Sequence, residues 1–247
     1  MKLYGLIGYP LSHSFSKKYF TEKFSREGID GCHYELFPLE DISLFPELWE
    51  KNTDLLGVNV TIPYKEKVIP FLDSASDVVM KTGACNCIKK TDGLLKGFNT
   101  DVIGFEKVLL RNLKPNHKAA LILGTGGAAK AVQYVLEQNN IEYLFVSRTS
   151  GKDLITYGDL NKEIITSHLL IINTTPLGMY PNTDVSPDIP YEFLLADHFL
   201  FDLIYNPSET LFLQKGASHG AFIQNGEDML AIQAEESWRI WNSTGNV

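Results

Sequence analysis

The chain has 247 residues, of which 44% are hydrophobic and 21% are charged, and its formal net charge is −8. This composition is typical of a globular protein with one large or two modest domains, and it argues against a disordered chain. Because the chain is acidic and has no run of lysine and arginine, it is a poor candidate for sequence-independent binding to nucleic acid.

The first half of the chain alternates short apolar strands with helical segments. The pattern predicts strands at 2–8, 33–37 and 55–61 and helices at 16–27 and 39–51. A hairpin is expected next, with strands at 84–89 and 94–98 joined by the turn residues Thr91-Asp92-Gly93. Strands separated by helices are typical of βαβ units and a largely parallel sheet.

A second series of strands and helices surrounds a break at Pro115-Asn116. A helix is predicted at 102–113, before the break, and strands at 118–123, 142–146, 169–173 and 200–204 follow it. The last predicted helix, 227–241, carries an apolar stripe of Leu230, Ala234, Trp238 and Trp241. Such a stripe needs a surface to cover, and we expect this helix to return to the first domain.

The cysteines and the apolar runs bear on disulfides, metal binding and the cellular compartment of the protein. Cys32, Cys85 and Cys87 do not form a disulfide framework, and a lone C-x-C lacks the second pair of a metal site, so no metal is expected. No apolar run approaches the roughly 20 residues of a membrane helix. The N-terminal MKLYGLIGYP is typical of a strand rather than a signal peptide. The sequence therefore predicts a cytoplasmic protein without a membrane partner.

A glycine-rich segment follows the predicted strand 118–123 and opens a helix that runs to about Gln138. Gly124, Gly126, Gly127, Ala128 and Ala129 give the pattern G-x-G-x-x-A. Glycines at these positions allow a tight turn and a close approach of the backbone to a pyrophosphate, which the helix N-terminus attracts. The strand before and the helix after make a dinucleotide site the favoured interpretation over a purely structural turn.

The end of the next strand bears on the choice of nucleotide. An NAD site usually has an acidic residue about 20 residues after the glycine loop, to bind the ribose 2′-hydroxyl. Here the chain has Ser147, Arg148, Thr149 and Lys152 instead, which can neutralise and bind a 2′-phosphate. The sequence therefore favours NADP, with a solvated basic turn as the alternative.

Several polar residues of the first half fall at strand ends and in loops, where an α/β sheet binds its ligands. They are Ser14, Ser16, Asn59, Thr61, Lys65, Asn86 and Asp101. Hydroxyls and amides around one ammonium suit a small polyhydroxylated carboxylate. Each residue taken alone has a structural alternative: a helix cap for Ser14, Ser16 and Asp101, a strand amide for Asn59, and a solvated side chain for Lys65.

Taken together, the polar segments and the glycine loop identify a family. The chain resembles the shikimate dehydrogenases over almost its whole length. The segments that carry the resemblance are SHSFS (12–16), GVNVTIPYK (57–65), GACNC (83–87), GFNTDVIGF (97–105), LGTGGAAKA (123–131), SRT (147–149), INTTPLGMYP (172–181), FDLIYNPSET (201–210) and NGEDMLAIQA (225–234).

The resemblance implies a reversible, NADPH-dependent reduction of 3-dehydroshikimate to shikimate, on the pathway to chorismate and the aromatic amino acids. It implies an α/β fold with two βαβ-type domains around a central cleft. Residues 1–101 plus 227–247 would form the substrate-binding catalytic domain, and residues 102–226 a Rossmann-like NADP-binding domain. The partners expected are the small-molecule substrate and NADP(H), in a monomer or homodimer.

The resemblance also implies roles for individual residues. Lys65 and Asp101 would form the catalytic pair, and Ser14 and Ser16 would hold the substrate carboxylate. Asn59, Thr61, Asn86, Tyr205 and Gln233 would bind or frame the ring. The cofactor would be held by Gly124, Gly126, Gly127, Ala128, Ser147, Arg148, Thr149 and Lys152. Thr174, Met179, Leu203 and Gly226 would lie near the nicotinamide. Whether Lys65 acts alone or as a dyad with Asp101 is left open by the sequence.

The chain departs from the family pattern at a few positions. Ser147 stands where the family usually has asparagine, and Lys152 replaces the last arginine of the same run, which would soften the preference for NADP. Cys87 and Lys17 also replace the usual threonine and proline.

Three rival interpretations remain. An enzyme that also oxidises quinate, with NAD, is disfavoured by the basic turn. A catalytically silent ligand-binding homologue is disfavoured by the presence of Lys65 and Asp101. A methylene-tetrahydrofolate dehydrogenase is disfavoured by the paired serines and the Asn-Thr-Asp motif.

Overall fold

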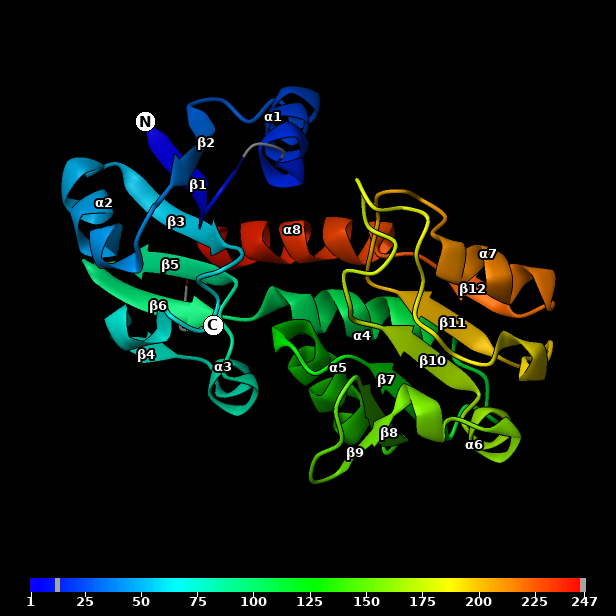
Figure 1. The fold of residues 1–247 in the computed structure, drawn as a ribbon. Helices are drawn as coiled ribbons and strands as arrows, with labels where there is room; N and C mark the ends of the chain where they lie inside the picture. Colours follow the sequence, from blue (N-terminus) through cyan, green and yellow to red (C-terminus); the bar gives the residue numbers. More distant parts are fainter. Residues whose placement is uncertain (12–13, 245–247) are drawn as a thin grey trace. The chain divides into compact units, whose positions relative to one another are not determined.

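The computed structural model describes residues 1–11 and 14–244, so Ser12 and His13 of the SHSFS motif and the last three residues of the predicted catalytic domain lie outside the described residues. The chain forms two compact units. Unit 1 comprises Met1–Gly104 together with the described residues from Ala231 onward, and unit 2 comprises Phe105–Leu230. Figure 1 traces the elements of both units along the chain.

Unit 1 is built on a six-stranded sheet in the order β2-β1-β3-β5-β6-β4. Its strands are β1 (Lys2–Gly8), β2 (Cys32–Pro38), β3 (Leu55–Val60), β4 (Ser74–Ala75), β5 (Cys87–Thr91) and β6 (Leu94–Phe98). Strand β1 runs parallel to β2 and β3, whereas β5 runs antiparallel to β3 and β6. The sheet is therefore mixed, where the sequence predicted a largely parallel one.

The hairpin between β5 and β6 accounts for this mixed order. Asp92 and Gly93 both have positive φ, 51° and 84°, and they lie between the paired residues Thr91 and Leu94. Two positive φ angles are the requirement of the two-residue turn whose twist matches that of a hairpin. The predicted hairpin is confirmed, and it reverses the chain beside β3.

Helices cover the sheet of unit 1. They are α1 (Phe15–Glu27), α2 (Phe45–Lys51), α3 (Asp77–Thr82), the first residues of α4 (Thr100–Asn112) and most of α8 (Glu227–Asn242), with short 3₁₀ turns η1 (Ile42–Leu44) and η2 (Ile69–Phe71). Helix α2 begins later than predicted, because the chain first makes the turn η1 and Pro46 then occupies the first helical turn.

Helix α8 fills the core of unit 1 with its aromatic side chains. The Trp241 ring stacks on Tyr4 with centroids 4.9 Å apart, and its Nε1 donates to the Ile88 carbonyl at 3.0 Å. Gly57 of β3 leaves the space that the indole occupies, since a Cβ there would overlap it. Part of the core of unit 1 is thus supplied by the last helix in the sequence.

Unit 2 contains a six-stranded sheet in which every neighbouring pair is parallel. Its strands are β7 (Ala119–Leu123), β8 (Glu142–Ser147), β9 (Leu154–Thr156), β10 (Leu170–Asn173), β11 (Phe199–Asp202) and β12 (Phe222–Gln224). The order is β9-β8-β7-β10-β11-β12. Counted within the unit, this is 3-2-1-4-5-6, the order of the Rossmann dinucleotide-binding sheet.

The strand order of unit 2 reverses between β7 and β10. Ligands of such sheets bind beyond the carboxyl ends of the strands at this point, so Gly124 after β7 and Thr174 after β10 mark the expected site. The helices of the unit are α5 (Gly127–Gln138), α6 (Lys162–Ser167), α7 (Leu211–Ser218) and the rest of α4 and α8, with 3₁₀ turns η3 (Tyr157–Asp159) and η4 (Tyr191–Phe193).

Candidate active site

Lys65 and Asp101 are in direct contact in unit 1. The Lys65 Nζ donates to the Asp101 Oδ2 at 2.7 Å, and the two side chains are 34% and 20% exposed. The pair is thus partly shielded from water, yet one side of it remains accessible to a small molecule. The two residues that the resemblance assigns to one catalytic pair are therefore in contact, and their catalytic role stays a prediction.

Local structure places each member of the pair. The strand β3 ends at Val60, a turn closes from the Tyr64 amide to the Thr61 carbonyl, and the Lys65 carbonyl then accepts from the Cys85 amide at 2.7 Å. Asp101 lies in the first turn of α4, where the helix dipole favours a carboxylate. The Asn99 side chain accepts from the Val102 amide and donates to the Ala84 carbonyl, which fixes the start of this helix.

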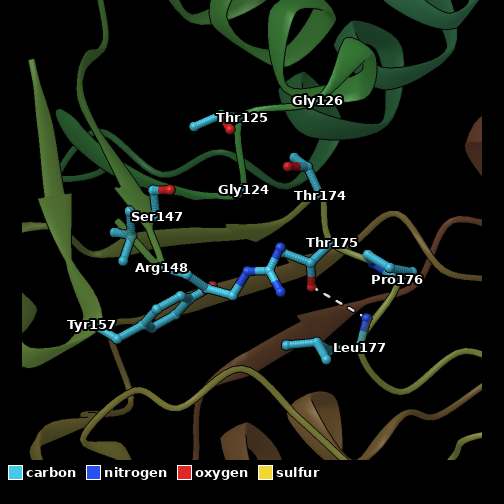
Figure 2. A pocket seen from close by; sticks show the side chains of 11 residues that line it. Gly124, Thr125, Gly126, Ser147, Arg148, Tyr157, Thr174, Thr175, Pro176 and Leu177 are labelled. Carbon is cyan, nitrogen blue, oxygen red and sulfur yellow. Dashed lines mark hydrogen bonds between the residues drawn. The ribbon is translucent and has the colours of Figure 1, made fainter. Parts of the chain in front are cut away.

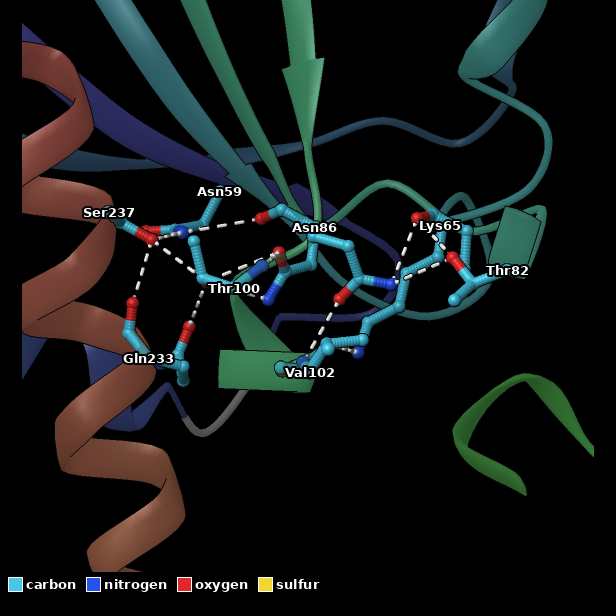
Figure 3. Close-up of polar contacts among 11 residues, drawn as sticks. Asn59, Lys65, Thr82, Asn86, Thr100, Val102, Gln233 and Ser237 are labelled. Carbon is cyan, nitrogen blue, oxygen red and sulfur yellow. Dashed lines mark hydrogen bonds and ion pairs between the residues drawn. The ribbon is translucent and has the colours of Figure 1, made fainter. Parts of the chain in front are cut away.

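A buried network of amides and hydroxyls lies beside this pair (Figure 3). The Asn86 Oδ1 accepts from the Thr100 amide at 2.6 Å, and the Asn86 Nδ2 donates to the Thr100 hydroxyl at 3.0 Å. The Thr100 hydroxyl also lies 3.2 Å from the Ser237 hydroxyl, and it donates to the Gln233 Oε1 at 3.4 Å. Thr100 directly precedes Asp101, so the network fixes the backbone that carries the catalytic candidate.

Asn59 belongs to the same network. Its Nδ2 donates to the Ser237 hydroxyl at 2.8 Å and to the Asn86 carbonyl at 3.3 Å, and its Oδ1 accepts from the Tyr34 hydroxyl at 2.9 Å. Asn59, Asn86 and Gln233 are all buried. Their amides are held by the protein, which gives them a framing position around the site.

The predicted serines and Thr61 occupy the ends of strands and helices in unit 1. The Ser14 hydroxyl accepts from the Lys17 amide at 3.3 Å and caps α1. Burial raises the pKa of Tyr34 well above its usual value, and a hydrogen bond with Ser16 opposes this rise. Ser16 thus lies near Tyr34, whose hydroxyl donates to Asn59. Thr61 is half-buried and packs against Gly8, where an added Cβ would lie 2.5 Å from its Cγ2.

Three residues of this network were not singled out from the sequence: Tyr34, Thr100 and Ser237. Thr100 lies inside the GFNTD motif, and Ser237 lies one helical turn after Gln233, so both had a positional signal. Tyr34 comes from the middle of β2 and had none.

Unit 2 contains a cavity of about 350 Å³ at the carboxyl ends of its strands (Figure 2). Its lining comes from the loop after β7, the ends of β8 and β9, and the loop after β10. The lining residues are Gly124, Thr125, Gly126, Val146, Ser147, Arg148, Tyr157, Thr174, Thr175, Pro176 and Leu177. This is the point at which the strand order reverses.

The glycine loop combines a left-handed turn at Gly124 with open space at Gly126. Gly124 has φ +103°, and a Cβ there would lie 2.9 Å from the Thr174 Oγ1. Gly126 precedes α5 and has no side chain to cap it, while a Cβ at Gly126 would meet no atom of the described residues within 4 Å. The Ala129 and Lys130 amides already donate to the Gly126 carbonyl, at 3.0 and 3.3 Å, so the N-terminal amides that remain for an anion are those of Gly127 and Ala128, where the helix carries a partial positive charge.

The predicted cofactor residues are distributed unevenly around the cavity. Ser147, Arg148 and Thr174 line it, whereas the exposed Thr149 and Lys152 are not among its lining residues. Gly226 packs so tightly on the Leu203 carbonyl that a Cβ there would overlap it. Met179 and Tyr205 are exposed, and their loops are joined by the bond from the Tyr180 amide to the Asn206 carbonyl at 3.2 Å.

A buried carboxylate behind the cavity is a further feature that sequence reasoning missed. Asp202 accepts from the Asn173 Nδ2 at 3.1 Å, the Ile204 amide at 3.0 Å and the Thr210 hydroxyl at 2.6 Å. The Asn173 Oδ1 accepts in turn from the amide and the hydroxyl of Thr175, which lines the cavity. Burial raises the pKa of Asp202 to about 6, although these three donors favour the ionised form.

Comparison with known proteins identifies the family. Residues 6–88 match the model of the shikimate dehydrogenase substrate binding domain, and this range lies within unit 1. A relative from Clostridium beijerinckii named shikimate dehydrogenase (NADP(+)) is 41% identical over 97% of this chain and 92% of its own length. The chain belongs to the shikimate dehydrogenase family.

Solved shikimate dehydrogenases share the whole architecture. The enzyme from Thermus thermophilus, in complex with NADP(H) and shikimate, is 30% identical with a TM-score of 0.86, over 98% of this chain and 94% of that chain. The enzyme from Listeria monocytogenes, in complex with shikimate and NAD, is 25% identical with a TM-score of 0.89, over 98% and 91%. The predicted family and the predicted α/β class, with a Rossmann-like second unit, are confirmed.

Two further observations concern the described part of this shikimate dehydrogenase family member. No helix within residues 1–11 and 14–244 is long and apolar enough to cross a membrane. Within the same residues, no group of three or more histidine, cysteine, aspartate or glutamate side chains has the arrangement of a metal site.

Proposed function

We propose that this protein catalyses the reversible, NADPH-dependent reduction of 3-dehydroshikimate to shikimate. The observation that carries the proposal is the partly exposed Lys65–Asp101 pair, held at 2.7 Å beside a buried network of amides and hydroxyls, in a member of the shikimate dehydrogenase family. The predicted division of labour, with substrate held by unit 1 and nucleotide by unit 2, is part of the same proposal.

The proton chemistry of the reaction suits this pair. The nicotinamide, when bound, supplies the hydride that reduces the carbonyl carbon. A developing alkoxide oxygen then needs a proton and a nearby positive charge, and the Lys65 ammonium can provide both. Asp101 accepts one ammonium hydrogen, which orients the remaining hydrogens of the Lys65 Nζ. In the reverse direction the neutral amine form of Lys65 takes up the hydroxyl proton of shikimate and becomes the ammonium again.

The substrate side of the proposal assigns polar groups to the other parts of the ring. Ser14 and Ser16, at the N-terminus of α1, would bind the carboxylate, which a helix N-terminus favours. Thr61, Asn86 and Gln233 would meet the ring hydroxyls, while Asn59 would hold Asn86 and Ser237 in place. Tyr205, on the loop after β11, is the remaining residue that the resemblance assigns to the ring.

The cofactor side fits NADP. The open space at Gly126 admits a pyrophosphate, and the amides of Gly127 and Ala128 would bind it. Arg148 and Ser147 would bind the 2′-phosphate from the end of β8, with Thr149 and Lys152 at its solvent side. Thr174, Met179, Leu203 and Gly226 would lie along the nicotinamide half.

One experiment tests the function directly. The purified protein is assayed by the absorbance of the reduced cofactor with shikimate or quinate, each with NADP⁺ or NAD⁺. We expect the highest kcat/KM with shikimate and NADP⁺. A higher value with quinate and NAD⁺ would make it a quinate dehydrogenase, and no turnover with any of the four pairs would leave only a ligand-binding homologue. A cytoplasmic location and a monomeric or homodimeric state remain predictions.

A further inference from the structure

We propose that Tyr157 is a further specificity-determining residue, whose phenol hydroxyl donates a hydrogen bond to the 2′-phosphate of NADP. The proposal rests on the proposed function, because it assumes an adenine nucleotide in the cavity of unit 2. Tyr157 lines that cavity together with Ser147 and Arg148 (Figure 2). It lies outside every motif that the sequence singled out.

The strand register brings Tyr157 to the phosphate-binding end of the cavity. Strands β8 and β9 are parallel, and their last paired residues are Ser147 and Thr156. Arg148 and Tyr157 therefore directly follow the ends of two adjacent strands, and neighbouring strands lie about 4.8 Å apart. An anion at the end of β8 would face both side chains.

The turn that carries Tyr157 is rigid. Tyr157 begins the 3₁₀ turn η3, and a capping box closes it. The Thr156 amide and hydroxyl both donate to the Asp159 Oδ2, at 2.7 and 2.6 Å. The ring of Tyr157 also packs against the apolar core of unit 2. The phenol is thus fixed before a ligand arrives, and little side-chain entropy is lost on binding.

The polar groups at this end of the cavity are available to an anion. Within residues 1–11 and 14–244, neither the Tyr157 hydroxyl nor the Arg148 guanidinium has a hydrogen-bond or ion-pair partner. Burial raises the pKa of Tyr157, and the positive charge of Arg148 opposes this rise, so the phenol stays protonated near neutral pH. It can therefore donate, which a phosphate with three acceptor oxygens requires.

Few cationic side chains of the described residues line this end of the cavity, so an additional hydrogen-bond donor such as Tyr157 can affect the binding of a phosphate. Lys152 is not among the lining residues, and Ser147 has a short side chain, so Arg148 is the long cation at this end of the cavity. The Tyr157 hydroxyl next to it adds a neutral hydrogen-bond donor. Hydrogen bonds to charged groups are stronger than those to neutral groups, so this donor should stabilise a bound 2′-phosphate more than a bound 2′-hydroxyl.

The test uses Tyr157→Phe in the full chain and measures binding of adenosine 2′,5′-bisphosphate and of 5′-AMP by calorimetry. We expect the variant to bind the bisphosphate about tenfold more weakly or worse, with 5′-AMP affinity unchanged. The matched control is Tyr143→Phe on β8, whose hydroxyl bonds Glu137 and Gln133 and which does not line the cavity. The control should bind both ligands as the natural chain does.

Three other outcomes would each refute a different part of this inference. If Tyr157→Phe binds both ligands normally, the inference is refuted and the proposed function stands. If it binds both ligands equally less well, the ring packs on the adenosine and the assigned hydrogen bond is refuted. If the natural chain shows no preference for the bisphosphate, there is no 2′-phosphate site and the inference fails with the choice of NADP. Turnover of shikimate, measured separately, reports on the function itself.

Discussion

Replacing Lys65 with methionine is the sharpest test of the catalytic pair. Methionine keeps an unbranched chain and removes the ammonium, and with it the hydrogen bond to Asp101 at 2.7 Å. A general acid typically contributes about 10² to 10⁴ in rate. At about 1.4 kcal/mol for each factor of ten, this is roughly 3 to 5.5 kcal/mol of activation free energy. We expect kcat for shikimate oxidation to fall by at least about 10².

The same substitution should change stability much less. Coulomb's law at an effective dielectric of about 20 gives a gross attraction of roughly 6 kcal/mol at this distance. Desolvation and the ordering of two side chains offset most of it, and partly exposed pairs contribute about 0–1 kcal/mol net. Since the side chains are 34% and 20% exposed, Asp101 stays solvated after Lys65 is removed. The expected loss in Tm is a few degrees.

The assay is steady-state kinetics with NADP⁺ and shikimate, with thermal unfolding as the check on folding. Lys65→Arg is the matched control, because arginine keeps the charge but does not release a proton. Asp101→Asn and the double variant then separate a lone lysine from a dyad, since residues that act as a unit are not additive. An unchanged kcat in Lys65→Met, with the protein folded, would remove Lys65 from the chemistry.

Three further predictions concern unit 2. Because burial raises the pKa of Asp202 from 3.8 to about 6, the folded state holds this proton more tightly, so the stability that it contributes is present below about pH 4 and lost as the pH rises through about 6. Asp202→Asn cannot ionise and lacks this loss. The Tm of the variant minus that of the natural chain should therefore increase between those pH values, by an amount equivalent to at most about 3 kcal/mol. A difference in Tm that does not change with pH would contradict the raised pKa. At the glycine loop, Gly124→Ala should cost more than about 1 kcal/mol of folding free energy in urea denaturation, because of its φ of +103° and the contact with Thr174. Gly126→Val should fold normally but bind NADP⁺ more weakly by calorimetry, and normal binding would place the pyrophosphate elsewhere.

The sequence predicted those parts of the fold that have a local cause. The turn between β5 and β6 was predicted because Asp92-Gly93 tolerates positive φ. The start of α5 was predicted because the glycine pattern follows a buried strand. Strands β4, β9 and β12 were missed, since two or three residues carry no periodicity. Yet β9 is the strand that delivers Tyr157 to the cavity.

The candidate site divides in the same way. Lys65 and Asp101 were found through their motifs, and the structure places their side chains in direct contact. The burial of Asn59 and its bonds to Tyr34 and Ser237 depend on residues far apart in sequence, so no local pattern contains them. Asp202 was within a quoted motif, but its role becomes visible only when Asn173 and Thr210 are seen around it.

The contribution of α8 to unit 1 has a consequence for how the protein is made. Trp241 stacks on Tyr4, and Ser237 bonds Asn59, so the core formed by the first hundred or so residues is finished by the part of α8 that is translated after all of unit 2. When unit 2 has just been synthesised, the N-terminal sheet has Gly57 uncovered and Asn59 without its hydrogen bond to Ser237. Unit 2 is one continuous segment and can close during synthesis, whereas unit 1 must wait for the last helix to arrive.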